Sequence, residues 1–138
     1  MRAIEFRGKI VGAEGFVYGK LLAPLASGNA YIAYDVNEVG SFVYISRSEK
    51  VDPETIGQYT GLKDKNGKKI FEGDIVNCKF FDRMVGDITG VINFIDCVWA
   101  VSDFKNKRLY QLIDVDNIEI IGNIHENPEL MEGTVNEK

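Results

Sequence analysis

The segment DPETIGQYTGLKDKNGKKIFEGDIV, residues 52–76, contains the densest run of turn and strand signals in the chain. Its Asp52-Pro53 pair favours a turn or the start of a helix. Its Asn66-Gly67 pair predicts a β-hairpin with a type I′ turn, because both central residues of that turn need positive φ. Gly73 then introduces a bend before the strand-like run DIVNCKF. We interpret the segment as a structural hinge between two sets of strands.

The residues before this hinge read as short antiparallel strands. Alternating or β-branched runs, each bounded by glycine or proline turns, predict strands over 2–7, 16–22, 30–36 and 41–46. Gly19 interrupts the second of these runs, which indicates a bulge or a close approach of two backbones. In the polar stretch RSEKVDPET that follows, Asp52 before Pro53 favours a turn or a helix start, and Thr55 to Tyr59 could be a helical turn or a strand.

The residues after the hinge predict five more short strands. These are expected over 74–80, 88–95, 98–104, 109–113 and 118–124. In the first of them Val76, Cys78 and Phe80 share one face. Five short antiparallel strands joined by tight turns are typical of a small SH3-like barrel, with an OB-like barrel as the nearest alternative.

The predicted fold class is therefore mainly β, with short antiparallel strands in two parts. We expect a β-rich N-terminal subdomain over 1–60 and an SH3-like barrel over 61–126. The tail over 127–138 is expected to begin with a helical turn and then to be partly disordered.

The composition excludes several classes of protein. The net charge of −5 and the pI near 4.9 disfavour sequence-independent binding of nucleic acid, which needs a positive field. Cys78 and Cys97 lie in apolar runs too far apart for a metal knuckle, so both are expected to be small buried hydrophobes. Without a secretory signal or an apolar stretch of about 18–20 residues, the expected location is the cytoplasm, away from any membrane.

The candidate catalytic and metal sites are weak. Gly67 falls at the wrong place for a calcium loop that would start at Asp64, and Gly12, Gly15 and Gly19 lack the strand-to-helix context of a phosphate loop. Glu72 and Asp74 are better explained as caps of the Gly73 bend. The sequence predicts no cofactor and no metal.

His125 is the only histidine in the chain. It is therefore the only histidine that could serve as a general base, with Cys78 or Cys97 as the nucleophile. A half-exposed histidine directly after a strand, bound to a carbonyl or to water, explains it better, so the sequence does not predict an enzyme.

Two groups of basic and aromatic residues are candidates for binding a partner. Lysines project from the predicted Asn66-Gly67 hairpin, and a second loop carries Lys105, Lys107 and Arg108. Small β-barrels bind nucleic acids or peptides through such loops and through exposed aromatic residues. Solvated hairpin tips that prevent edge-to-edge pairing are the alternative explanation. The candidate partner-binding residues are Tyr59, Lys63, Lys65, Lys68, Lys69 and Trp99.

Several stretches of the chain carry a family resemblance. They are EFRGK (5–9), FVYGKLL (16–22), VDPETIGQYTGLKDKNGKKIFEGDIV (51–76) and IEIIGNIHENPEL (118–130). In these stretches the chain resembles the YopX protein family of phages and prophages of low-GC bacteria, over about residues 2 to 131. The resemblance implies a β-rich accessory protein of a mobile element, with a barrel-like C-terminal part. It implies no activity and no site residues.

The expected function is therefore non-catalytic binding of another macromolecule by a β-barrel surface. A protein from the host or the phage is the expected partner. Nucleic-acid binding through the Lys63–Lys69 hairpin and a self-assembling structural module, which would make the chain a homo-oligomer, are the alternatives.

Overall fold

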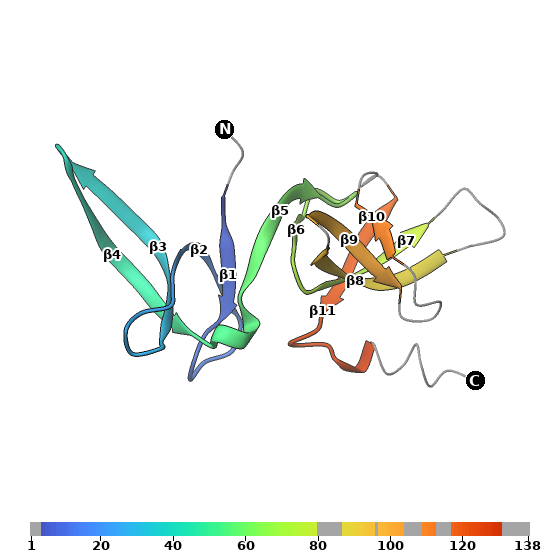
Figure 1. Cartoon of the computed structure of the whole chain (residues 1–138), viewed down its shortest axis with the longest axis horizontal. Coiled ribbons are helices and arrows are strands. Elements are labelled where there is room, and N and C mark those ends of the chain that lie inside the picture. The colour runs from blue at the N-terminus through green and yellow to red at the C-terminus, as the bar shows by residue number, and fades with distance from the viewer. Residues whose placement is uncertain (1–3, 80–86, 96, 104–108, 113–116, 131–138) are drawn as a thin grey trace. The chain divides into compact units, whose positions relative to one another are not determined.

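The computed structural model describes residues 4–79, 87–95, 97–103, 109–112 and 117–130. The predicted mainly β fold class is confirmed, since antiparallel strands make up nearly all regular structure in these ranges (Figure 1). In chain order the elements are β1 (Phe6–Lys9), β2 (Phe16–Leu22), β3 (Ala30–Val39), β4 (Phe42–Val51), the 3-10 helix η1 (Pro53–Thr55), β5 (Gly57–Lys63), β6 (Lys69–Phe71), β7 (Asp74–Lys79), β8 (Asp87–Ile95), β9 (Val98–Asp103), β10 (Leu109–Gln111) and β11 (Ile118–Asn123).

The chain divides into two compact units, unit 1 (Met1–Tyr59) and unit 2 (Thr60–Lys138). The predicted domain boundary lay one residue later, after residue 60. Each unit has a separate cluster of buried apolar side chains.

In unit 1 the strands follow the order β4-β3-β2-β1, and the first residues of β5, Gly57 and Gln58, pair with β1; each neighbouring pair is antiparallel. The core of this unit is small. Among the described residues Ala30, Ile32 and Val51 form the buried cluster, and half-buried side chains such as Phe6 and Val17 cover it.

Three strand boundaries in unit 1 differ from the prediction. β1 starts at Phe6 and continues through Gly8, which was expected to end it. β3 runs on to Val39, and β4 runs through the polar residues Arg47 to Lys50, beyond the predicted end at residue 46. β4 is an edge strand, so its polar side chains reach water without leaving the sheet.

In unit 2 the predicted five strands after residue 73 are present as a sheet with the order β10-β9-β8-β7-β11. Among the described residues β10 and β11 are the two edges of an open sheet, so the SH3-like barrel stays a prediction. The predicted shared face of β7 is confirmed for Val76 and Cys78, which are both buried, whereas Phe80 lies outside the described residues. The predicted cationic loop Lys105–Arg108 also lies outside them.

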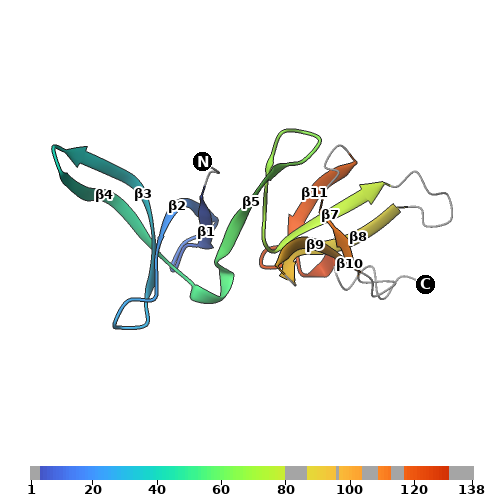
Figure 2. The ribbon, with the colours of Figure 1, turned by 45° about the horizontal axis from the view of Figure 1, so that its top comes forward.

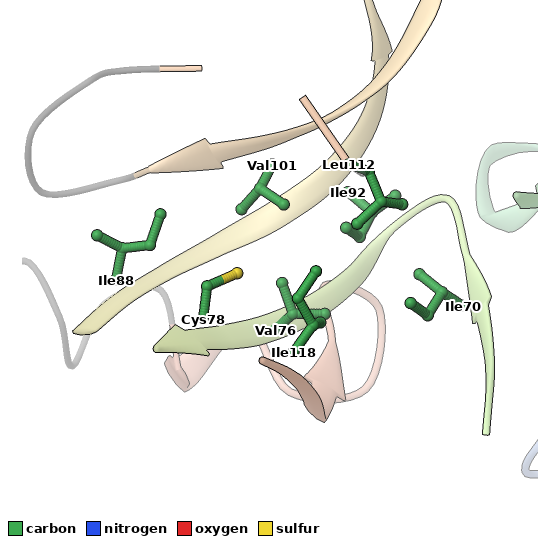
Figure 3. Close-up of a cluster of buried hydrophobic side chains, with 8 residues drawn as sticks. All are labelled: Ile70, Val76, Cys78, Ile88, Ile92, Val101, Leu112 and Ile118. Carbon is green, nitrogen blue, oxygen red and sulfur yellow. The ribbon is translucent and has the colours of Figure 1, made fainter. Parts of the chain in front are cut away.

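Among the described residues, the core of unit 2 is larger than that of unit 1. Figure 3 shows its buried side chains. Apolar side chains from four strands and from two neighbouring segments meet on one side of the sheet. The buried members are Ile70, Val76, Cys78, Ile88, Ile92, Val101, Leu112 and Ile118. Burial raises the pKa of the Cys78 thiol to about 12, and the charge of Asp103 adds to that rise.

The predicted helix start at Asp52 is confirmed. The Asp52 carboxylate accepts a hydrogen bond from the Glu54 N–H (3.0 Å), and Pro53 occupies the first position of η1. The ambiguous segment after it contains both elements that were considered, because η1 ends at Thr55 and β5 starts at Gly57. A side-chain cap followed by proline at the first position is a favourable helix start.

The hairpin between β5 and β6 is present, but the type I′ turn was wrong. Of its two central residues only Gly67 has positive φ, at 83°. The Gly67 N–H donates to the Asp64 carbonyl (3.0 Å), and the Asp64 N–H donates to the Lys68 carbonyl (2.7 Å). This is a type I turn followed by a left-handed glycine, with aspartate at the favoured first position.

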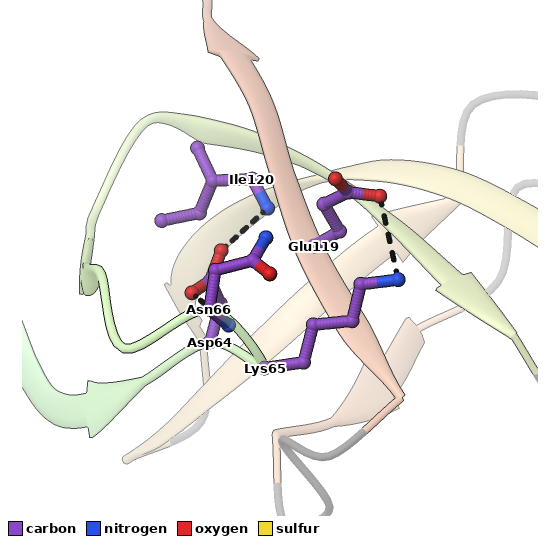
Figure 4. A network of polar contacts seen from close by, with 5 residues as sticks. All are labelled: Asp64, Lys65, Asn66, Glu119 and Ile120. Atoms are coloured by element: carbon purple, nitrogen blue, oxygen red, sulfur yellow. Dashed lines mark hydrogen bonds and ion pairs between the residues drawn. The ribbon is translucent and has the colours of Figure 1, made fainter.

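The Asp64 side chain decides this turn type (Figure 4). Its carboxylate is 5% exposed and accepts the N–H groups of Asn66 (2.9 Å), Lys68 (2.9 Å) and Ile120 (3.0 Å). The Lys65 N–H also donates to the Ile118 carbonyl (3.0 Å). One carboxylate therefore closes the turn and holds it against β11.

The Gly73 bend is held by hydrogen bonds from both sides. The Gly73 N–H donates to the Ile92 carbonyl (2.9 Å), and the Gly73 carbonyl accepts from the Ile124 N–H (3.0 Å). The predicted cap is confirmed for Asp74, whose carboxylate accepts the Phe71 N–H (2.8 Å). The distinctive residues of the central segment thus serve the conformation of the chain, as the hinge interpretation expected.

The expectation that Cys97 is buried was wrong. Cys97 is exposed in the turn between β8 and β9 and has a φ of 67°, which side chains other than glycine rarely adopt. Its apolar neighbours belong to the two strands that the turn connects, so the local composition describes the strands and not the turn.

Candidate interaction surface

The hairpin formed by β3 and β4 is the most exposed part of unit 1, and Figures 1 and 2 show it projecting beyond β2. Gly40, with a φ of 61°, and Ser41 form its two-residue loop, and Val39 lies opposite Phe42. We call the distal part of this hairpin, Tyr34–Ser46, the arm.

A change of register separates the arm from the base of the hairpin. On β3 the pairing shifts between Ala33 and Asp35, and it shifts back between Asp35 and Val36. On the base side of these irregularities Ile32 and Ala33 are buried, whereas Tyr34 and Val36 are exposed. Such bulges increase the local twist of a ribbon, and here they mark the point at which burial ends.

The arm is apolar on both of its faces. Val36 lies opposite Ile45, and Val39 lies opposite Phe42. Successive residues of a strand point to opposite faces, so the first pair lies on one face and the second pair on the other. Every residue of β4 from Phe42 to Ser48 is exposed.

The exposed apolar area of the arm is large. Phe42 is 77% exposed and Val43 is 64% exposed. The seven apolar side chains that are each at least 40% exposed are Tyr34, Val36, Val39, Phe42, Val43, Tyr44 and Ile45. With full areas of about 150–250 Å² for such residues, they expose on the order of 700 Å² together. Apolar patches of this size mark interaction sites on soluble proteins.

The polar residues of the arm are few and satisfy one another. The Asn37 side-chain amide donates to the Ser46 hydroxyl (2.7 Å) and to the Asp35 carboxylate (3.2 Å). The ionisable side chains of the arm that carry a charge at neutral pH are Asp35 and Glu38, both acidic. The arm therefore offers an apolar surface without a cation, which suits a protein and not a polyanion.

The predicted lysines lie on the β5–β6 hairpin of unit 2. Lys63, Lys65, Lys68 and Lys69 are all exposed, as expected for a hairpin tip. The Lys65 ammonium is 3.6 Å from the Glu119 carboxylate, so this lysine is not available as an isolated charge (Figure 4).

The predicted aromatic residues do not join these lysines in one described surface. Tyr59 is only 7% exposed, so its side chain has little area to offer a partner. Trp99 is half-buried against the core of unit 2, edge-to-face with Phe94 at 4.9 Å between ring centroids. In sheet order β8 and β7 lie between Trp99 on β9 and the strand β11 that holds the lysine hairpin. Their roles in binding stay predictions.

His125 is half-buried in the turn that follows β11. Its N–H and that of Glu126 donate to the Asn123 side-chain oxygen, at 3.0 and 2.9 Å. The described residues contain no group of three or more histidine, cysteine or acidic side chains that could hold a metal ion.

The sequence contains one signal for the arm. Phe42–Ile45 is a run of four consecutive apolar residues without alternation. Such a run is typical of a strand that is covered on both faces. In the structure neither face of this run is covered.

The comparisons with known proteins agree with the motifs quoted above. The model of the family described as YopX protein matches residues 5–132. A comparison with the curated proteins found no match.

Two solved structures share the fold over nearly the whole chain. Protein EF1440 from Enterococcus faecalis is similar with a TM-score of 0.58 and 26% identity, over 95% of this chain and 99% of that chain. Protein YopX from Bacillus subtilis is similar with a TM-score of 0.53 and 19% identity, over 94% of this chain and 96% of that chain. Neither name describes an activity.

Proposed function

The chain belongs to the YopX protein family, and from this premise we propose that it is a phage- or prophage-encoded accessory protein that binds another protein without catalysis. We place this role in the cytoplasm of the bacterial host. Within the described residues no helix is long and apolar enough to cross a membrane.

The arm is the observation that carries this proposal. A two-stranded ribbon is marginally stable in water by itself, and strands need a covered apolar face to be stable. The arm leaves apolar pairs open on both faces. A protein that covers them gains stability from burial, at about 25 cal/mol for each Å² of apolar surface.

Binding without catalysis is supported by the state of Cys78, one of the two cysteines considered as nucleophiles. Cys78 is buried, and its thiol pKa is raised to about 12. At neutral pH almost none of it is the reactive thiolate. A pairing of Cys78 with His125 as a general base therefore has no support.

The test is capture from infected or induced host cells that contain the tagged chain and an untagged, isotopically distinct copy of it. We expect the tagged wild type to retain a protein, and the variant Phe42→Ser/Tyr44→Ser to lose it. The variant Leu109→Ser is the matched control, because Leu109 is an exposed apolar residue of unit 2 (54%). A wild type that retains no protein, or an arm variant that retains it equally, would overturn the proposal.

Nucleic-acid binding by the Lys63–Lys69 hairpin is the second candidate. Its support is four exposed lysines on one hairpin. The net charge of −5 and the ion pair of Lys65 with Glu119 count against it. Filter binding decides between the two: retention of DNA or RNA that falls steeply with salt, and that disappears in Lys63→Glu/Lys68→Glu, would favour this candidate.

A further inference from the structure

We infer that the protein bound by the arm is a second copy of this chain, and that the two copies pair antiparallel along β4 about a two-fold axis at Tyr44. The inference rests on the proposed function and names its partner.

The free edge of β4 has a defined extent. β4 is the last strand of its sheet, and its C-terminal end is already occupied by the segment after β1. The Val11 N–H donates to the Lys50 carbonyl (2.9 Å), and the Asp52 N–H donates to the Lys9 carbonyl (2.9 Å). The edge is therefore open from Phe42 to about Glu49, among the strands that the structure describes.

This edge lacks the usual protection against pairing. Sheet edges are blocked in proteins by lysine, proline or inward-pointing charges. The stretch Phe42–Ser46 carries none of these. A strand that docks here must itself be extended, apolar and uncharged. The same stretch in a second copy meets all three conditions, and it is present wherever the chain is present.

The register follows from the requirement that opposite residues suit each other. A two-fold axis at Tyr44 places Tyr44 opposite Tyr44 of the second copy and Val43 opposite Ile45 of the second copy. Phe42 then lies opposite Ser46, and no two like charges face each other. Aromatic and β-branched cross-strand pairs stabilise a sheet by about 0.2–1 kcal/mol each.

Two other registers are less favourable. An axis at Arg47 would place Arg47 opposite Arg47 of the second copy, which is destabilising. An axis at Ser48 would pair Arg47 with Glu49 twice, but it would leave Phe42–Ile45 without a partner strand. Only an axis near the middle of the apolar run covers that run.

The area of the arm also fits a dimer. Specific interfaces bury about 800 Å² on each partner. The exposed apolar side chains of the arm account for on the order of 700 Å². Pairing along β4 joins the two ribbons into one continuous sheet, so the exposed apolar side chains of both copies lie side by side on each face of that sheet.

Sedimentation equilibrium on the full chain tests the partner and the register together. We expect the wild type to be dimeric at micromolar concentration. Val43→Lys/Ile45→Lys should weaken the dimer at least about tenfold, because it places lysines opposite each other twice. Val43→Lys/Ile45→Glu should keep the dimer, because each lysine then faces a glutamate.

The control for this experiment is Val98→Lys/Leu109→Lys in unit 2. It makes the same change at two exposed apolar positions that do not belong to the arm, so it should leave the dimer intact.

Disulfide trapping tests the register independently of stability. In a Cys97→Ser background, Tyr44→Cys should form a disulfide-linked dimer on oxidation, because residues opposite each other in antiparallel strands have Cβ atoms about 4.5–5.5 Å apart. Ser48→Cys is equally exposed on the same strand and should not crosslink. Equal crosslinking of both variants would overturn the register.

The inference and the proposed function fail differently. A wild type that is monomeric up to roughly 100 µM, or a double-lysine variant that stays dimeric, overturns the inference. If the wild type captures a protein other than this chain, and the arm variant does not retain that protein, the proposed function stands. The assignment of a second copy as the partner is then wrong. If the wild type neither dimerises nor captures a protein, both are wrong.

Discussion

Asp64 shows at the scale of one residue how a surface hairpin is joined to a distant strand. Burial by itself would raise the pKa of its carboxyl, but the N–H groups of Ile120, Lys68 and Asn66 stabilise the anion, and the charge of Lys68 adds to them. The net result is a pKa below the ordinary value. The ionised form is thus the one that the fold binds.

This lowered pKa predicts a pH-dependent effect of Asp64→Asn. A carboxyl whose pKa is lower in the folded state stabilises the fold above its unfolded pKa of about 4, and that stabilisation is lost as the pH falls through the folded value. At pH 7 we expect the variant to lose roughly 2 kcal/mol of unfolding free energy. The difference from the wild type should shrink below pH 4.

Urea unfolding followed by the fluorescence of Trp99, the only tryptophan, measures this effect in unit 2. Asp52→Asn is the matched control, because Asp52 also caps a backbone N–H but lies in unit 1. It should leave the Trp99 transition unchanged. A difference between Asp64→Asn and the wild type that is the same at pH 3 and pH 7 would contradict the assignment.

The two cysteines are expected to differ sharply in reactivity. Cys97 is exposed, whereas Cys78 is 3% exposed and has a thiol pKa of about 12. Because only the thiolate attacks a disulfide reagent, one thiol per chain should react rapidly at pH 8 and the other only after unfolding. Cys97→Ser should remove the rapid phase, and Cys78→Ser should keep it. Two rapid equivalents in the wild type would show that the core of unit 2 opens readily.

At the scale of elements, Gly19 lets β2 and β3 approach each other. A Cβ atom at this position would lie 2.3 Å from the Ala33 carbonyl oxygen, which is backbone and cannot rotate away. Gly19→Ala should therefore destabilise unit 1 by roughly 2–3 kcal/mol. We expect the amides of β2 and β3 to exchange their hydrogens about 30- to 100-fold faster, since 1.4 kcal/mol corresponds to a factor of ten.

Gly12→Ala is the control that distinguishes the steric clash at Gly19 from the general cost of replacing a glycine. Gly12 has a φ of 82°, but a Cβ atom there would meet no atom within 4 Å. The variant Gly12→Ala should lower the free energy of unfolding by only about 1 kcal/mol, the usual penalty for a non-glycine residue in the left-handed conformation. If both variants exchange alike, the close approach at Gly19 does not limit the stability of the sheet.

The same close approach shows what sequence patterns can predict. A glycine inside a strand-like run indicated a bulge or a close contact, and the contact is confirmed. The turn type at Asn66-Gly67 was wrong because it depends on the Asp64 carboxylate, which binds Ile120, 56 residues further along the chain. A short sequence pattern carries no information about hydrogen bonds between residues so far apart in the chain.

The arm marks a different limit of the sequence. β-branched and aromatic residues correctly predicted strands in β3 and β4, but periodicity reports the type of an element and not what covers it. Phe42–Ile45 reads as a strand buried on both faces, and within this chain the described structure leaves it exposed. If a second copy covers the arm, the sequence pattern describes the dimer and not the monomer.

At the scale of the whole molecule, the two units have unequal cores. The buried cluster of unit 1 contains three described residues, whereas that of unit 2 contains eight. Since apolar burial is the main source of stability, the free energy of opening should be lower for unit 1. Separate cores also predict separate transitions, which would violate two-state unfolding of the chain.

Hydrogen-exchange pulses along a urea titration, with Trp99 fluorescence read in the same samples, test this order. We expect the amides of β1–β4 to lose protection at lower urea than the Trp99 transition. Ile32→Ala should shift only the first transition, and Ile92→Ala only the second, because each side chain is fully buried in one of the two cores. Coincident transitions that shift together in both variants would show one cooperative domain.

Pairing of the arms makes the urea concentration at which unit 1 opens depend on the protein concentration. The arm belongs to unit 1, so a dimer that forms through it stabilises unit 1 by mass action and leaves unit 2 unaffected. Raising the protein concentration tenfold should therefore move the protection transition of β1–β4 to higher urea, while the Trp99 transition stays in place. Val43→Lys/Ile45→Lys should abolish that shift. If the Trp99 transition moved instead, the association would depend on unit 2, and the assignment of the dimer to β4 would be wrong.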